Sequence, residues 1–224
     1  MFTPTYCYSD GLPLQETPMS AVLTPPHFAD AEAYLAWEEL QTERHELVDG
    51  EVFAMVGARL THNTIALNAA FFLRQVLKGG PCRVYGLDVK LRPDEQGDFF
   101  YPDVVVTSDP RDRQPSEDRF VSHPWLVVEV LSDSTAACDR GRKFEAYRTI
   151  DTLTHYLLVE QARPRAELFS KNEQGLWVLR PLAMGDSIPI PIGRLPQPWA
   201  VASLFDEVDF TPPPAASTPA PPQP

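Results

Sequence analysis

The sequence predicts a mixed α/β (α+β) fold, in which helices flank a central mixed β-sheet. Two runs of strand length, residues 102–107 and 125–131, consist largely of Val and Leu, as in strands that are buried on both faces. Residues 60–78 carry apolar side chains at helical spacing. Helical and strand patterns alternate along the 224 residues, which is typical of one domain with helices packed on a sheet.

The first elements of this domain are expected to be a helix and a β-hairpin. Asp30 can cap a short helix over residues 31–40, because an aspartate at this position accepts hydrogen bonds from free backbone N–H groups. Asp49-Gly50 separates two apolar runs within residues 45–56. This dipeptide is a strong signal for a two-residue hairpin turn.

The remaining elements follow from the same patterns. The helix over residues 60–78 is stopped by Gly79-Gly80-Pro81. A third helix is expected over residues 136–150, introduced by the hydroxyl-rich residues 132–135. The expected strands are residues 82–85, 89–92, 102–107, 126–131, 155–160, 165–170 and 177–183.

The two ends of the chain differ from the centre in composition. Residues 1–27 are rich in Pro, Thr and Ser without any period, and we expect a flexible N-terminal arm. Residues 211–224 carry no charge and are half proline, so we expect an extended, disordered tail. The domain itself is expected to span residues 28–210.

Charge and composition limit the classes of function. The net charge of −12 argues against a protein that coats DNA, although a bound metal and local basic residues can still attract nucleic acid to one site. Three scattered cysteines indicate neither a disulfide framework nor a zinc cluster. Neither a membrane-spanning run nor a signal peptide is recognisable. We therefore expect a cytoplasmic protein without a membrane partner.

Asp103 and Glu129 are the most informative residues, because each is a carboxylate within a buried apolar run. A buried charge is costly unless it is compensated. At 4 Å and an effective dielectric near 20, two such carboxylates repel by about 4 kcal/mol. A divalent metal would turn this repulsion into binding, and oxygen ligands are those that Mg²⁺ prefers. Alternatively, Asp103 is an ordinary strand-entry residue and Glu129 forms a structural salt bridge.

A lysine near the two acids would complete a site for phosphate chemistry. Lys143 follows the strand that contains Glu129, and Asp139, Lys143 and Tyr147 share one helix face. Lys90, in a strand before Asp103, is the other candidate. The alternative for Lys143 is an exposed ion pair with Asp139.

The ordered series of these residues resembles the Uma-type restriction endonuclease family of the PD-(D/E)xK nuclease superfamily. The matching positions are Pro102-Asp103, Glu129 within Val-Val-Glu-Val-Leu-Ser, and Asp139, Lys143 and Tyr147. Residues 45–51 look like the family's opening hairpin, and residues 155–159 look like the strand after its lysine helix. His62 opens the long helix much as the family's histidine does. The similarity covers residues 28–206.

The resemblance implies a restriction-endonuclease-like core and a site that depends on Mg²⁺ or Mn²⁺. Asp103 and Glu129 would be metal ligands, with the backbone carbonyl of Val130 as a possible third. Leu131 stands where the superfamily carries its lysine, so Lys143 would supply the positive charge from the next helix.

Further residues have supporting roles under this interpretation, each with a simpler alternative. Glu46 would add a carboxylate, or is an ordinary acid beside a turn. His62 would transfer a proton or donate a hydrogen bond, or caps the helix. Arg140 and Arg142 would touch phosphate, or lie on a solvated helix face.

The function that this pattern predicts is a metal-dependent endonuclease that hydrolyses phosphodiester bonds in DNA. The acidic charge and the missing strand lysine favour an alternative, a nuclease-like binding or regulatory module with weak catalysis. A third possibility is a structural protein whose buried acids are satisfied by hydrogen bonds. Enzymes that cut both strands often act as symmetric pairs, so a homodimer is expected.

Overall fold

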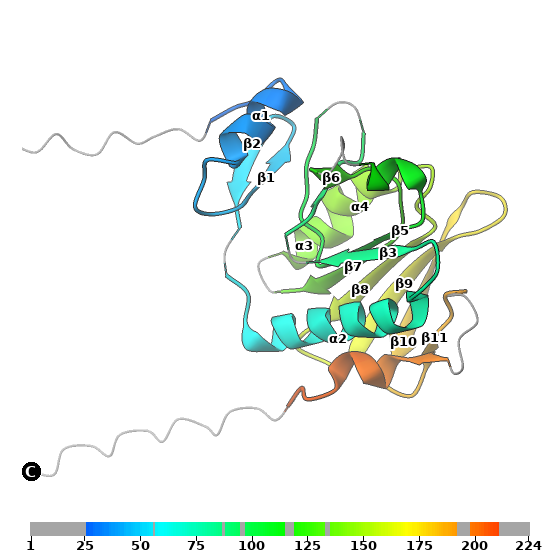
Figure 1. The fold of residues 1–224 in the computed structure, drawn as a ribbon. Helices are drawn as coiled ribbons and strands as arrows, with labels where there is room; N and C mark the ends of the chain where they lie inside the picture. The colour runs from blue at the N-terminus through cyan, green and yellow to red at the C-terminus, as the bar shows by residue number, and fades with distance from the viewer. Residues whose placement is uncertain are drawn as a thin grey trace, which may run out of the picture.

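A six-stranded sheet in the order β10-β9-β8-β7-β5-β3 forms the centre of the computed structural model (Figure 1). Strands β7 and β8 are parallel, and all other neighbours are antiparallel. The sheet is therefore mixed, as predicted. Its strands are β3 (Arg83–Gly86), β5 (Val104–Thr107), β7 (Pro124–Leu131), β8 (His155–Glu160), β9 (Arg165–Lys171) and β10 (Trp177–Ala183).

The structure describes residues 26–55, 57–86, 88–94, 97–114, 119–132, 135–191 and 198–210. The tail expected at residues 211–224 lies outside the described residues, and so does the expected arm except for its last two residues. Of these, His27 forms an isolated bridge with Glu51. None of the helices in the described ranges combines the length and the apolar character needed to cross a bilayer.

Helices cover the two faces of the sheet (Figure 1). Helix α2 (Leu60–Leu77) lies on one face, where Ile65, Ala69 and Leu73 pack against alternate strand residues such as Val104 and Val128. The C-terminal elements β11 (Ser187–Ile188), β12 (Trp199–Ala200) and the 3₁₀ helix η4 (Val201–Phe205) join this layer.

The second face is covered by one helical segment that follows β7. It consists of α3 (Ala136–Cys138), a π-helical turn η3 (Asp139–Lys143) and α4 (Phe144–Tyr147). Tyr147 packs here with the other set of alternate strand residues, including Val105 and Val127. Because successive side chains of a strand point to opposite faces, Asp103 and Glu129 belong to this second face.

The helix predicted over residues 136–150 is shorter and less regular than expected. It ends at Tyr147, where the Thr149 hydroxyl donates to the Ala146 carbonyl oxygen and replaces a helical hydrogen bond. Its centre is the π-helical turn, a feature that frequently occurs at functional sites.

Two strands are also shorter in the structure than predicted. Strand β5 begins at Val104, because Pro102 has no N–H and the N–H of Asp103 donates to the Glu129 carboxylate. The strand predicted over residues 89–92 reduces to β4 (Lys90–Leu91), which lies outside the main sheet and pairs with β6 (Phe120–Val121). A 3₁₀ turn η1 (Pro110–Arg113) precedes β6.

The N-terminal helix and hairpin form a small lobe with its own core. Helix α1 (Ala31–Glu38) is capped by Asp30 as predicted, and β1 (His45–Val48) pairs with β2 (Glu51–Ala54). The turn has φ of 50° at Asp49 and 81° at Gly50, which is the backbone of a type I′ hairpin. The buried residues of this core are Tyr34, Leu35, Leu47, Val52 and Phe99.

A two-way backbone contact attaches this lobe to the segment that leads into β5. The N–H of Leu47 donates to the Phe99 carbonyl oxygen at 2.9 Å, and the N–H of Phe99 donates to the Leu47 carbonyl oxygen at 2.8 Å. The hairpin is thereby fixed next to Tyr101-Pro102-Asp103. It carries Glu46 to the edge of the second face.

Candidate active site

Asp103 and Glu129 approach each other from neighbouring antiparallel strands. The register pairs Val104 with Val128, so Asp103 and Glu129 occupy the next opposed positions. The N–H of Asp103 donates to the Glu129 carboxylate at 3.4 Å, and the N–H of Val130 donates to the Asp103 carboxylate at 2.6 Å. Backbone donors thus orient both acids toward the same end of the sheet.

Lys143 joins these acids from the π-helical turn. Its Nζ lies 2.9 Å from Glu46, 3.3 Å from Asp139 and 3.4 Å from Glu129, and its side chain is 6% exposed. Tyr147, one turn further along, donates its hydroxyl to Glu129 Oε1 at 3.0 Å. One ammonium and one phenol therefore hold the buried Glu129 carboxylate.

Glu46 reaches the site from β1 in the N-terminal lobe. Its carboxylate accepts a hydrogen bond from the N–H of Tyr101 at 3.1 Å, in addition to the ion pair with Lys143. The lobe thus contributes a charged group to the same cluster as the central sheet.

His62 reaches the cluster from the first turn of α2. Its Nε2 lies 2.8 Å from Asp103 Oδ1. Burial alone would lower the pKa of His62, but the hydrogen bond and the negative charge of Asp103 outweigh burial, and the pKa is raised. The imidazole is therefore protonated over a wider pH range than a free histidine.

The cluster contains more carboxyl groups than the single ammonium of Lys143 can balance. Burial raises the pKa of Glu129 well above its usual range, and the charge of Asp139 adds to this effect while Lys143 opposes it. Burial also raises the pKa of Asp139. Burial would lower the pKa of Lys143, yet Glu129, Glu46 and Asp139 raise it well above the usual range. Lys143 hence stays charged and cannot act as a base near neutral pH.

A pocket of about 970 Å³ opens over these residues, between the N-terminal lobe and the end of β7. Asp103, Glu129, Val130, Asp139, Lys143 and His62 all line it. Glu46 and Tyr147 do not line the pocket and contact the lining residues from behind.

Arg140 and Arg142 do not line the pocket. Arg140 pairs with Glu160 at 3.5 Å and with Glu167 at 3.1 Å. Arg142 pairs with Asp49 in the hairpin turn. Each arginine is thus already engaged by carboxylates, and its contact with nucleic acid stays a prediction.

The pocket also contains polar groups that sequence reasoning missed. Glu38 at the end of α1 is buried and accepts a hydrogen bond from the Tyr101 hydroxyl at 2.8 Å. Gln161 after β8 has a buried amide oxygen without a hydrogen-bond partner among the described residues. Neither residue stands in a motif. Tyr101, the hydrogen-bond partner of Glu38, could have been noticed in the sequence, because it stands directly before Pro102-Asp103.

The donor chemistry of the cluster fits a hard divalent cation. Across the described residues, no three His, Cys, Asp or Glu side chains form a metal-binding group. An ion would accordingly depend on the carboxylates of Asp103 and Glu129, the carbonyl of Val130 and water, a ligand set that is typical of Mg²⁺. The excess of buried carboxylates over lysine is the observation that supports this fit.

This chain is similar to known proteins in sequence and in fold. Two uncharacterised proteins of Synechocystis sp. are relatives. The protein slr1290 is 41% identical over 148 residues, covering 66% of this chain and 77% of its own length. The protein sll1609 is 34% identical over 172 residues, covering 77% of this chain and 96% of its own length.

A solved structure supports the fold. The crystal structure of "a putative nuclease belonging to DUF820" from Anabaena variabilis superposes with a TM-score of 0.62 at 14% identity, covering 74% of this chain and 92% of that chain. The family model Uma2, described as "Putative restriction endonuclease", matches residues 31–195. This match spans most of the chain, and the chain therefore belongs to the Uma2 family.

Proposed function

We propose that this protein is a metal-dependent endonuclease that hydrolyses phosphodiester bonds in DNA. The observation that carries the proposal is the convergence of Asp103, Glu129 and Lys143 in one pocket, with more carboxyl groups than Lys143 alone can balance. The family description and the nuclease-like fold support the same reaction class.

Asp103 and Glu129, with the Val130 carbonyl, would hold Mg²⁺ or Mn²⁺. When bound, such an ion polarises a phosphodiester oxygen and lowers the pKa of a bound water. The chain's own residues prepare this site. Tyr147 and Lys143 orient the Glu129 carboxylate, and the N–H of Val130 orients Asp103.

His62 and Asp139 would support the reaction from the edge of the site. His62 holds Asp103 through Nε2, and its raised pKa keeps a proton available beside the acids. Asp139 lies 3.3 Å from Lys143 Nζ, and its charge helps to keep that ammonium protonated. Both side chains line the pocket and would face a substrate that is bound there.

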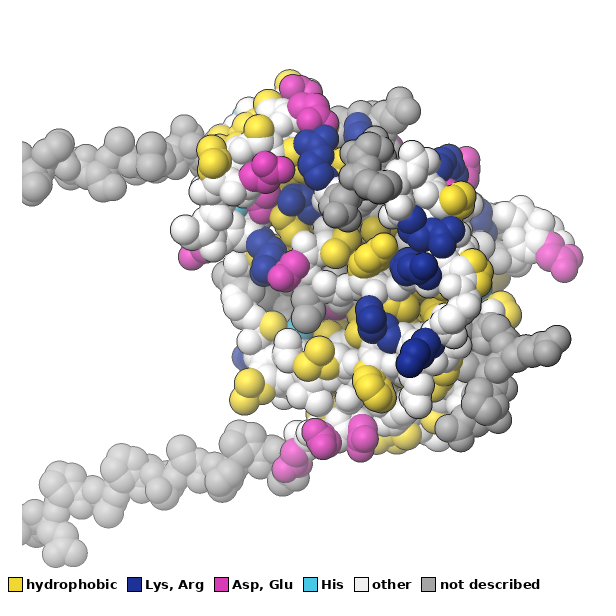
Figure 2. Space-filling view, in the orientation of Figure 1, with side chains coloured by type: hydrophobic (Ala, Val, Ile, Leu, Met, Phe, Trp, Pro, Cys, Tyr) yellow, Lys and Arg dark blue, Asp and Glu magenta, His cyan; other side chains and the backbone are white. Residues whose placement is uncertain are grey.

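Basic and acidic side chains gather in different places on the face that Figure 2 shows. Figure 2 shows Lys and Arg side chains over β3 and the end of α2, a mixture of basic and acidic side chains over the N-terminal lobe, and acidic side chains near η4. The charged side chains are therefore unevenly distributed over this face.

A catalytically weak binding module is the second candidate. It is favoured by the internal ion pairs of Lys143, which engage Glu46, Asp139 and Glu129 without any ligand. Titration calorimetry with Mg²⁺ separates the two functions. The enzyme requires binding at millimolar Mg²⁺ or below, and the absence of binding favours the module.

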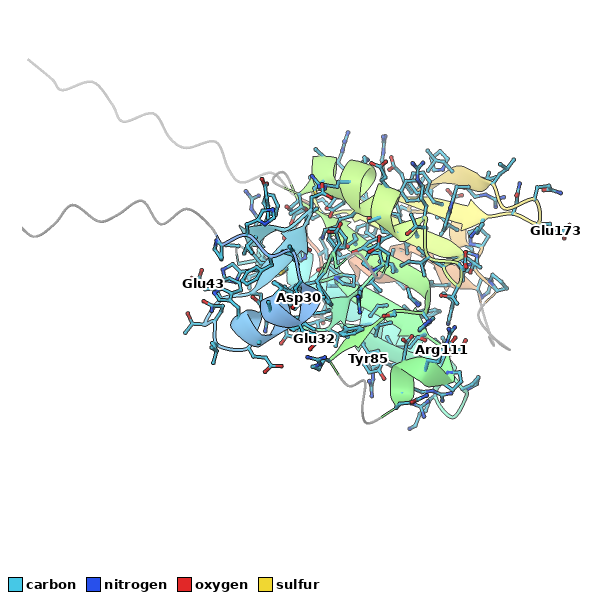
Figure 3. The ribbon with its side chains drawn as sticks, turned by 90° about the horizontal axis from the view of Figure 1, so that it is seen from above. Asp30, Glu32, Glu43, Tyr85, Arg111 and Glu173 are labelled. Carbon is cyan, nitrogen blue, oxygen red and sulfur yellow. The ribbon has the colours of Figure 1, made fainter. Side chains whose placement is uncertain are left out.

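Cleavage of plasmid and single-stranded DNA with Mg²⁺ or Mn²⁺ tests the enzyme directly. Asp103→Ala and Glu129→Ala should each abolish cleavage. Glu173→Ala is the matched control, because Glu173 lies at the tip of the β9–β10 hairpin and points away from the rest of the molecule (Figure 3). Cleavage that persists in both site variants would defeat the proposal.

We also infer that the protein acts as a homodimer in the cytoplasm, because cutting both strands of a duplex suits a symmetric pair. Sedimentation of the protein with and without duplex DNA tests the dimer. A monomer in both conditions would exclude it.

A further inference from the structure

The two lysines that line the pocket have different surroundings. Four Lys and Arg side chains line the pocket among the described residues: Arg44, Arg59, Lys90 and Lys143. Arg44 is paired with Asp88 at 2.7 Å, and Lys143 is held by three carboxylates. Neither Arg59 nor Lys90 has an ion pair within 4 Å in the described part of the chain.

Lys143 has little capacity left for a substrate. Its ammonium has three proton donors, and three carboxylates already lie within 3.4 Å of it. Binding a phosphate through Lys143 would require at least one of these contacts to break, which would expose a buried carboxylate without its partner.

Lys90 is held beside Tyr101 by the backbone and lines the same pocket as Asp103. The N–H of Leu91 donates to the Phe100 carbonyl oxygen at 2.8 Å, and the N–H of Phe100 donates to the Leu91 carbonyl oxygen at 3.0 Å. This antiparallel bridge places Lys90 beside Tyr101, two residues before Asp103. Its Nζ lies 5.3 Å from the centre of the Tyr101 ring, so the aromatic ring orients the ammonium.

The surroundings of Lys90 leave its charge free for an anion. The side chain is partly buried. Burial lowers its pKa, although the charges of Glu38 and Glu39 oppose this effect. A partly dehydrated ammonium without a carboxylate partner gains more from an incoming anion than a fully solvated one. Arg59, in contrast, is exposed at the start of α2.

We propose that Lys90 is a substrate-binding residue that contacts a non-bridging oxygen of the phosphodiester, while Lys143 remains with the buried acids. The inference rests on the proposed function for the substrate class, a phosphodiester. It assigns separate tasks to the two lysines of the pocket: Lys143 balances the acids, and Lys90 attracts the substrate.

Binding measurements test this assignment without relying on cleavage. The probe is the dinucleotide d(TpT), titrated by calorimetry in Ca²⁺ into the full chain and into Lys90→Met and Lys90→Arg. Met keeps the apolar stem against Tyr101 and removes the charge. We expect Lys90→Met to weaken binding about tenfold or more and Lys90→Arg to restore most of it. Lys78→Met, at the exposed end of α2, is the matched control and should bind like the parent.

Two further readouts separate this role from a merely structural one. With a labelled duplex, Lys90→Met should reduce the slope of log affinity against log salt by about one. The NMR signal of the Lys90 ε-CH₂ group should shift when d(TpT) is added to the parent protein. The signal of Lys78 should stay in place.

The outcomes distinguish this inference from the proposed function. If Lys90→Met binds d(TpT) like Lys78→Met and the Lys90 signal does not move, the inference is overturned, even where the protein cleaves DNA. If Lys90 responds to d(TpT) and no metal supports cleavage, the phosphate contact stands and the nuclease proposal falls. If the parent binds neither d(TpT) nor duplex, both are overturned.

Discussion

Replacing Lys143 by Met removes the ammonium that three buried carboxylates share, and we expect a large loss of stability. The distances of 2.9, 3.3 and 3.4 Å and the 6% exposure of the side chain place this contact inside the protein. Removing one partner of a buried ion pair costs about 3–5 kcal/mol. For a domain of this size, the melting temperature should fall by about 10 °C.

The loss should depend on pH in a defined direction. Burial already raises the pKa of Glu129 and of Asp139, and removing Lys143 raises both further. An acid whose pKa is higher in the folded than in the unfolded state opposes folding as the pH rises above its unfolded value of about 4.5. The deficit of Lys143→Met should accordingly be larger at pH 8 than at pH 5.

Urea denaturation at both pH values, in EDTA and in Mg²⁺, provides the measurement. Lys78→Met is the control and should lie within about 0.5 kcal/mol of the parent. Mg²⁺ at 100 times its dissociation constant should return about 2.7 kcal/mol to a fold that binds it. A deficit at pH 8 below 1 kcal/mol, or one that shrinks between pH 5 and pH 8, would refute the reasoning.

Three other substitutions test separate parts of the structure. Glu129→Gln should raise the free energy of unfolding by about 1 kcal/mol in EDTA at pH 8, because it removes the acid whose charge burial disfavours, while Glu46 and Asp139 keep Lys143 paired. The same change should reduce the stabilisation by Mg²⁺. Lower stability in EDTA with an unchanged Mg²⁺ response would contradict this. Asp112→Ala should lower the free energy of unfolding by about 3 kcal/mol. Its buried carboxylate accepts hydrogen bonds from the Thr107 hydroxyl and from donors of Ser122 and His123. A loss below 1 kcal/mol in urea denaturation would show that water replaces these bonds. Burial lowers the pKa of His155 to about 4, so its contribution to stability is present above pH 6.5 and lost as the pH falls toward 4. His155→Phe should flatten the stability profile in that window, and an unchanged profile would exclude His155 as the cause.

The sequence predicted the sheet and its helices well, because the local signals agreed with the tertiary structure. Asp30 and Asp49-Gly50 each define a local backbone conformation, and both appear as expected. The Val-rich runs became β5 and β7 because strands that are buried on both faces need apolar residues throughout.

Other features could not be predicted because they depend on distant partners. Strand β4 lies outside the main sheet, because Leu91 forms backbone hydrogen bonds with Phe100. No local sequence pattern predicts this pairing. Glu38 is buried at the end of α1 by its hydrogen bonds with Tyr101 and His45, although a glutamate at a helix end normally faces solvent.

The position of Lys143 was anticipated, but its environment was not. Helical spacing alone brings Asp139, Lys143 and Tyr147 to one face. It cannot show that Glu46, almost a hundred residues earlier, completes the carboxylate set from the hairpin. That contact exists only after the lobe has docked on the sheet.

The β1–β2 hairpin contacts two segments that line the pocket or lead into it. Leu47 is bonded to Phe99, on the approach to Asp103, and Asp49 in the turn pairs with Arg142, the neighbour of Lys143. Any tilt of this small lobe would pull Glu46 from the lysine and widen the entrance in a single movement. The width of the pocket and the ion pairs at its base would then change together, so the N-terminal hairpin couples the shape of the pocket to its electrostatics.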